Sequence, residues 1–111
     1  MTDADRVARL RQLNDAFRQT FVGGMVVITV GVQALGPRAV TAILHQVRTF
    51  NAFTADNDPY GEHDFGAFDA GQERVLWKID YYDASGIAGS EHPEDPEATT
   101  RVLTIMLAEE W

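Results

Sequence analysis

Carboxylates are the residues of this sequence most able to do chemistry, and they crowd its second half. Twelve of the seventeen Asp and Glu residues lie in residues 51–97, where Arg74 and Lys78 are the only Lys or Arg residues. Carboxylates at this density repel one another, so they must face water, a metal ion or a basic partner. The sequence therefore points to two chemistries, the binding of a divalent ion and the binding of a basic surface.

The segment 56–66 can be compared with the calcium loop of an EF-hand. Asp56 and Asp58 occupy the first and third ligand positions, and Gly61 occupies the sixth, where the turn glycine belongs. Tyr60 stands at the fifth position, however, and Ala67 stands where a bidentate Glu is required. The pattern therefore argues against a standard EF-hand.

A divalent site of another kind is an open alternative. Asp, Glu and His supply the oxygen and nitrogen ligands that suit Mg²⁺, Mn²⁺ or Zn²⁺. The side chains expected to surround such an ion are His63, Asp64, Asp80 and Asp83. This set predicts a small metal-dependent hydrolase acting on a phosphoester. The simpler interpretation, which we favour, is that Asp58, Glu62 and Asp64 cap turns by accepting backbone N–H bonds.

Several other chemistries have no support in the sequence. There is no cysteine, which excludes a disulfide, a thiolate metal site and a cysteine nucleophile. No Gly-x-Ser-x-Gly elbow, phosphate-binding loop or dinucleotide-binding glycine pattern occurs. We therefore expect no catalytic residue and no cofactor, with a divalent metal ion as the alternative.

The charge is distributed unevenly along the chain. Residues 1–50 carry six Arg and three Asp, whereas residues 51–111 carry three cations and fourteen acids, and the net charge is −8. Affinity for nucleic acid comes mainly from Lys and Arg, so we expect no direct nucleic-acid binding. The acidic start of the chain lacks the features of a signal peptide, and no apolar run approaches the roughly 20 residues that a membrane span needs. We therefore expect no membrane association and a soluble, cytoplasmic protein.

The elements that must position these residues follow from hydrophobic spacing. Apolar residues at helical spacing, with Thr2 and Asp5 as a capping box, predict a first helix that ends at a Gly-Gly pair. A second helix is expected to begin near Pro37. For residues 98–109 a strand is expected, and a helix is the competing interpretation. Runs of β-branched or alternating apolar residues predict strands at residues 25–32, 65–69, 74–82 and 102–107.

These elements predict a single α+β domain over residues 1–111, in the order α-β-α-β-β-β. Two amphipathic helices on one face of an antiparallel sheet of about four strands would form a two-layer sandwich and bury the apolar stripes. If the middle strands form a hairpin, the long polar loops 51–64 and 83–98 lie at the same end of the sheet. Long loops in a small domain are often functional. We therefore expect an acidic rim at that end.

Three segments of the chain resemble a small uncharacterised bacterial family, namely residues 57–66, 77–82 and 100–107. The resemblance extends from about Asn14 to the C-terminus, and the first segment is the most distinctive. Members of that family occur largely in alphaproteobacteria, often on plasmids and other mobile elements. The resemblance implies a genomic setting in which small accessory and anti-defence proteins are common, and it carries over no catalytic residue.

The leading hypothesis is a non-catalytic acidic binding protein. Surface carboxylates would imitate phosphate spacing and dock on a basic nucleic-acid-binding surface of a host defence or DNA-handling protein, like an anti-CRISPR or anti-restriction inhibitor. The residues expected to meet this partner are Asp56, Asp58, Tyr60, Glu62, Asp64, Asp83, Glu91, Glu94 and Asp95. The remaining alternative is a structural or oligomerisation domain, in which the Arg-bearing N-terminal helix contacts the acidic half of a second copy.

Overall fold

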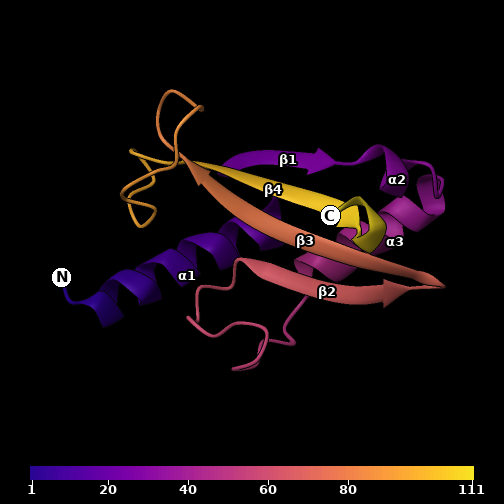
Figure 1. Ribbon diagram of the computed structural model, residues 1–111, viewed down its shortest axis with the longest axis horizontal. Coiled ribbons are helices and arrows are strands. Elements are labelled where there is room, and N and C mark those ends of the chain that lie inside the picture. The colour runs from indigo at the N-terminus through magenta and orange to yellow at the C-terminus, as the bar shows by residue number, and fades with distance from the viewer.

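Two long helices pack on one face of a four-stranded sheet in the computed structural model, which describes residues 1–111 (Figure 1). The predicted α+β class is confirmed, with α1 and α3 as the helices that cover the sheet. In chain order the elements are α1 (Asp3–Thr20), β1 (Gly24–Ile28), α2 (Val30–Gln33), α3 (Pro37–Arg48), β2 (Phe65–Ala70), β3 (Glu73–Tyr82), β4 (Thr100–Leu107) and the 3-10 turn η1 (Ala108–Glu110).

The strand order is β1-β4-β3-β2, so the last strand of the chain lies inside the sheet. The three C-terminal strands pair with one another in antiparallel fashion, as predicted. β1 is parallel to β4, with Gly24 opposite Arg101 and Ile28 opposite Ile105, so the sheet is mixed and not wholly antiparallel. The alternation of apolar residues decides which face of a strand is buried, and it holds no information about the direction of the neighbouring strand.

α1 and α3 begin where their sequence signals place them. The Asp5 N–H donates to Thr2 Oγ1 (3.1 Å) and the Asp5 carboxylate accepts from the Thr2 N–H (3.3 Å), which completes the capping box. Pro37 lies in the first turn of α3, where its missing N–H costs no bond. α1 ends at Thr20 and is capped by Phe21, which takes a left-handed conformation (φ 60°) and donates its N–H to the Phe17 C=O.

The segment 25–32 departs from its predicted strand, because β1 ends early and the chain turns into the short helix α2. The Gly31 N–H donates to Glu110 Oε2 (3.0 Å) and Thr29 Oγ1 donates to Glu110 Oε1 (2.6 Å), so η1 fixes this turn. Residues 98–109 contain β4, so the strand interpretation is confirmed there and the helix interpretation is wrong. Neither α1 nor any other helix combines the length and the apolar character that crossing a bilayer requires.

The buried core lies between the sheet and the two long helices. Phe17 from α1 and Ile43 and Val47 from α3 pack against the sheet. Gly66 of β2 lies opposite Trp77, and a Cβ at this position would collide with the indole ring. Burial of apolar side chains here is the main favourable term in folding. The sheet residues of the core alternate along β3 and β4 and are at most 5% exposed: Val75, Trp77, Ile79, Leu103, Ile105 and Leu107.

Candidate functional site

Asn14 of α1 is fully buried and connects the helix to the sheet and to the first polar loop. Its Nδ2 donates to the Glu62 C=O (3.0 Å) and to Tyr81 Oη (2.8 Å), and its Oδ1 accepts from Arg101 Nε (2.9 Å). Both polar atoms of the side chain therefore have partners, which offsets the cost of removing them from water. One amide thus positions the loop before β2 relative to β3 and β4.

Arg101 of β4 is 3% exposed and extends this network to the second polar loop. Its Nη2 donates to the Pro93 C=O, and its guanidinium lies over the Tyr81 ring, 5.4 Å from the ring centroid. Burial lowers the pKa of the Arg101 guanidinium. The group keeps its charge at neutral pH, because arginine does not deprotonate in proteins. A buried cation therefore anchors the acidic loop 83–98.

Glu62 and Asp64 are two partly buried carboxylates beside Tyr81. Burial raises the pKa of Glu62, and the charge of Asp64 raises it further. Burial also raises the pKa of Asp64, against the lowering effect of hydrogen bonds that include one from Tyr81 Oη to Asp64 Oδ2 (3.3 Å). Burial and the charge of Asp64 raise the pKa of Tyr81 in turn. These two carboxylates therefore hold protons more readily than exposed ones do, and Tyr81 stays a neutral donor.

Glu62 also lines a shallow hollow of about 290 Å³ between the start of α1 and the second loop. Three of the seven lining residues are carboxylates, and Arg6 is the only cation among them. Arg6 Nε lies 3.4 Å from Glu94 Oε1, so this cation is already paired. No serine, threonine or cysteine lines the hollow. Its chemistry is that of a negatively charged surface, suited to attracting a basic group.

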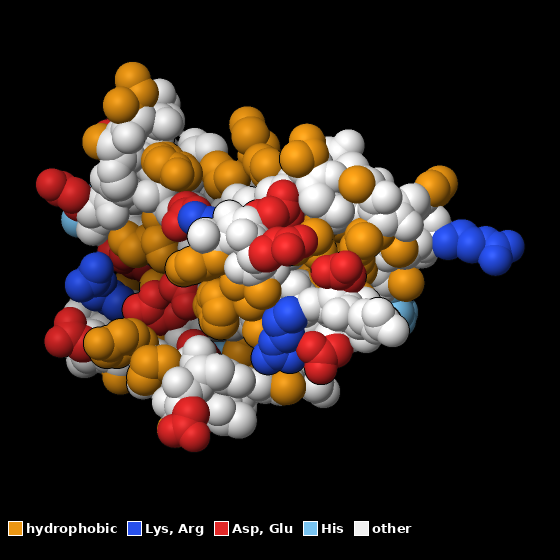
Figure 2. Space-filling view, turned by 45° about the vertical axis from the view of Figure 1, so that its right-hand side comes forward, with side chains coloured by type: hydrophobic (Ala, Val, Ile, Leu, Met, Phe, Trp, Pro, Cys, Tyr) orange, Lys and Arg blue, Asp and Glu red, His pale blue; other side chains and the backbone are white.

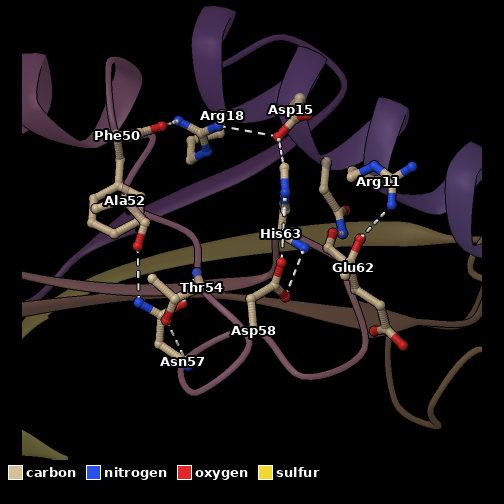
Figure 3. A network of polar contacts seen from close by, with 12 residues as sticks. Arg11, Asp15, Arg18, Phe50, Ala52, Thr54, Asn57, Asp58, Glu62 and His63 are labelled. Atoms are coloured by element: carbon tan, nitrogen blue, oxygen red, sulfur yellow. Dashed lines mark hydrogen bonds and ion pairs between the residues drawn. The ribbon is translucent and has the colours of Figure 1, made fainter.

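His63 contacts two carboxylates, Asp15 of α1 and Asp58 of its own loop (Figure 3). Its Nδ1 lies 2.9 Å from Asp15 Oδ1 and its Nε2 lies 3.5 Å from Asp58 Oδ2, while its backbone N–H donates to Asp58 Oδ1 (3.2 Å). The imidazole ring stacks on Phe53, with 3.8 Å between centroids. His63 holds a left-handed backbone (φ 54°), which is uncommon for a residue with a side chain. These contacts hold the loop in one conformation.

Arg18 is the second buried arginine at this junction, with 2% of its surface exposed. Its Nη2 donates to Asp15 Oδ1 (3.1 Å), and its guanidinium lies near the rings of Phe53 and Trp77. A cation is favourable here because the last carbonyls of a helix carry partial negative charge. Arg18 Nη1 donates to three carbonyl groups at and just beyond the end of α3, those of Val47 (3.0 Å), Arg48 (3.3 Å) and Phe50 (2.9 Å).

The four residues of the predicted metal site do not come together. His63 contacts other carboxylates, and Asp64 accepts from the Tyr81 hydroxyl. Asp80 lies on the sheet face that points away from the helices, where Lys78 Nζ is 2.7 Å from its carboxylate. Asp83 accepts bonds from Ser85 within a turn of its own. No three His, Asp or Glu side chains are grouped so that they could hold a metal ion, and the metal interpretation has no geometric support.

The predicted acidic rim is present in part. The loops 51–64 and 83–98 lie at the same end of the sheet (Figure 1). Figure 2 shows that carboxylate side chains are scattered among apolar ones on the face it presents. Asp58 and Glu94 have side chains only 7% and 15% exposed, because Asp58 contacts His63 and Glu94 pairs with Arg6. Of the other predicted partner residues, Glu62, Asp64 and Asp83 are partly exposed, and four are exposed: Asp56, Tyr60, Glu91 and Asp95.

Sequence reasoning missed the buried polar residues that hold the loops, which are Asn14, Arg18 and Arg101. Two of them left a signal in the sequence. Asn14 follows Leu10 by four positions on the apolar stripe of α1, and Arg101 lies two positions before Leu103, on the same buried face of β4. A polar residue on an otherwise apolar face indicates a buried hydrogen-bond network.

The family described as "Protein of unknown function (DUF3768)" matches residues 28–110, about three quarters of the chain. The chain belongs to this family. The DUF3768 match contains both polar loops and the three C-terminal strands, and it leaves out α1 and nearly all of β1. His63 and Arg101 therefore lie inside the match, whereas Asp15 and Asn14, which they contact, lie before it. No curated protein and no solved structure matches the chain.

Proposed function

We propose that this protein is a non-catalytic binding protein whose acidic loop end docks on a basic surface of another protein. The observation that carries the proposal is unneutralised charge. Of the twelve carboxylates in residues 51–97, three form ion pairs with Lys or Arg, namely Asp69, Asp80 and Glu94, and Asp58 contacts the imidazole ring of His63. The other eight have no ion-pair partner: Asp56, Glu62, Asp64, Glu73, Asp83, Glu91, Asp95 and Glu97.

The other arginines near the loops form no ion pair with these eight carboxylates. Arg18 and Arg101 are buried and bond mainly to backbone carbonyls and to Asn14. Arg11 of α1 donates to the Gly61 C=O (2.9 Å) and so holds the first loop against this helix. The surface of the loop end therefore keeps a negative potential, which attracts a basic partner and speeds encounter.

The loops that carry the charge are held in place before any partner arrives. Asn14 and His63 fix the first loop, and Arg101 fixes the second. A surface that is already ordered loses less conformational entropy on binding than a mobile one. The exposed Tyr60 (78% exposed) adds an aromatic side chain of the kind that is enriched at protein interfaces.

The basic surface proposed as the target is a nucleic-acid-binding groove of a host defence or DNA-handling protein. Such grooves are lined by Lys and Arg that neutralise phosphates, and carboxylates spaced over two rigid loops can occupy the same positions. The protein would then act in the cytoplasm as an inhibitor, and the mobile-element setting implied by the family resemblance suits that role. Nucleic acid itself would not bind, because it carries the same charge sign as the loops.

The experiment compares three versions of the protein as baits for proteins from a bacterial lysate at low salt. Each captured protein is then purified, its affinity is measured at two salt concentrations, and its displacement from DNA or RNA is measured. The rim variant reverses three exposed carboxylates without ion pairs, Asp56→Lys, Glu91→Lys and Asp95→Lys. The matched control makes the same change in net charge away from the loops, with Asp69→Lys, Glu73→Lys and Glu109→Lys.

The proposal predicts that the rim variant loses the partner, that the control keeps it, and that affinity falls steeply as salt rises. It also predicts that the wild-type protein displaces nucleic acid from the partner. Retention of every partner by the rim variant, or affinities that do not change with salt, would contradict the proposal.

A further inference from the structure

β1 is an edge strand whose exposed surface is apolar and uncharged. No charged residue occurs in residues 19–37, although 23% of the chain is charged. Figure 2 shows apolar side chains along the upper margin of the molecule, where Figure 1 places β1. Four of the eight large hydrophobic side chains that the structure exposes lie in residues 22–30: Val22 (75% exposed), Met25 (58%), Val27 (38%) and Val30 (81%).

The two edges of the sheet differ in how they are protected. Native edge strands usually carry a charge, a proline or a bulge that prevents pairing with another chain. β2 follows this rule, because its exposed Asp69 pairs with Arg74 (3.1 Å) and Trp111 packs edge-on against Phe65. β1 has no charge and no proline, and its pairing with β4 runs without a bulge. β1 is therefore the open edge.

The backbone of β1 presents unpaired groups along this edge. The Thr29 N–H donates to the Ile105 C=O (3.1 Å), and successive residues of a strand direct their backbone groups to opposite sides. The odd-numbered residues of β1 therefore bond to β4, and the even-numbered residues face outward. Gln33 Nε2 donates to the Ile28 C=O (2.7 Å), as this direction requires. Val26, at the middle of β1, thus offers a free N–H and a free C=O.

We propose that β1 pairs with β1 of a second copy of this chain, in an antiparallel two-fold dimer centred on Val26. In this register Val26 exchanges both backbone hydrogen bonds with its counterpart on the axis. Met25 lies opposite Val27 of the second copy, and Val27 lies opposite Met25, as an isologous interface requires. These two exposed apolar side chains of β1 then pack against their counterparts across the two-fold axis. The two sheets become one sheet of eight strands.

The distribution of charge makes this edge the most favourable place for two copies to meet. Each chain carries a net charge of −8, so copies repel wherever their acidic loops approach. The uncharged segment 19–37 allows contact without placing like charges together. β1 begins beside the start of β4, which follows the acidic loop 83–98. Antiparallel pairing therefore places the acidic loops of the two copies at opposite ends of the dimer, where they remain free.

Sedimentation of the protein distinguishes a monomer from a dimer by mass. Because the chain contains no cysteine, introduced cysteines can then test the register. Wild type is expected to sediment at twice the chain mass, and Val27→Lys is expected to halve it, because the lysine enters the contact with Met25 of the second copy. The control is Ile87→Lys, which changes an equally apolar side chain (86% exposed) in the loop 83–98 and should remain dimeric. Circular dichroism checks that each variant is folded.

For the register, single Met25→Cys and Val27→Cys variants are oxidised separately and as a mixture. Opposed residues next to a hydrogen-bonded pair have Cα atoms about 4.5 Å apart, within the range for a disulfide, whereas the diagonal positions are about 7–8 Å apart. The mixture should therefore form a disulfide dimer much faster than either variant alone. Equal rates in all three samples would overturn the proposal. So would a monomer at concentrations up to about 1 mM, where even a weak dimer forms, or a Val27→Lys variant that remains dimeric.

Discussion

Replacing Arg18 with methionine removes a buried guanidinium from the junction of α1, α3 and the first polar loop. In the wild-type protein its Nη1 donates to three carbonyl groups at and beyond the end of α3, and its Nη2 donates to Asp15. Methionine keeps an unbranched side chain that can pack against Trp77 and Phe53. The substitution therefore leaves most apolar packing in place and isolates the loss of polar contacts.

The expected loss of unfolding free energy is about 3–5 kcal/mol, the range found when one partner of a buried charged contact is removed. The lower end applies here, because Arg18 Nε has no hydrogen-bond partner and because Asp15 keeps its contact with His63. A loss of about 3 kcal/mol is a large share of the roughly 5–15 kcal/mol that stabilises a domain. At about 4–8 °C per kcal/mol, it would lower the Tm by roughly 12 °C or more.

Urea unfolding followed by far-UV circular dichroism measures this loss, with Arg9→Met as the matched control. Arg9 is exposed on the same helix, and its replacement should change stability by no more than about 0.5 kcal/mol. If Arg18→Met lost less than about 1 kcal/mol, the buried contacts would contribute no more than exposed ion pairs do. That result would refute the reasoning.

Three further outcomes are expected. Glu62→Gln should stabilise the protein at neutral pH by less than about 1 kcal/mol after solvent screening, because burial and the charge of Asp64 raise the pKa of Glu62 on folding. Unfolding curves measured over a series of pH values should show this gain disappear below the ordinary carboxyl pKa, because Glu62 is then protonated in both the folded and the unfolded state. Gly66→Ala should cost about 1–3 kcal/mol in thermal unfolding, because the added methyl collides with Trp77. His63→Phe can keep a ring stack but loses both carboxylate contacts, so chemical unfolding should show a loss of about 1–3 kcal/mol.

The sequence predicted those parts of the fold that local signals specify. Three of these signals are the capping box at Thr2, the first-turn position of Pro37 and the period-two alternation of β3. Each depends on residues only a few positions apart in the chain. The parallel pairing of β1 with β4 could not be read in this way, because it depends on which strand enters the middle of the sheet. α2 was missed because Val30 and Val32 favour a strand by propensity, and the bonds that bend the chain there come from Glu110.

The candidate site was likewise predictable only in those features that local signals specify. The two loops were expected at one end of the sheet because a hairpin fixes that relation, and the structure places them there. The partners of individual side chains were not predictable, since His63 contacts Asp15, 48 positions away, and Arg101 contacts Asn14, 87 positions away. Contacts over such separations depend on tertiary packing, which the spacing of residues along the chain does not reveal.

The place of β4 in the sheet also determines the order in which the chain can fold. β2 and β3 are joined by a tight turn and can pair early, whereas Gly24 of β1 must find Arg101 across 77 positions of chain. Closing a loop of that length costs entropy before any strand contact compensates for it. β4 is the only strand that pairs with β1, so the backbone groups on both sides of β1 stay unpaired until β4 has docked beside β3. Entry of β4 is therefore expected to limit the rate of refolding, and the interval before it is the time at which the chain is most prone to aggregate.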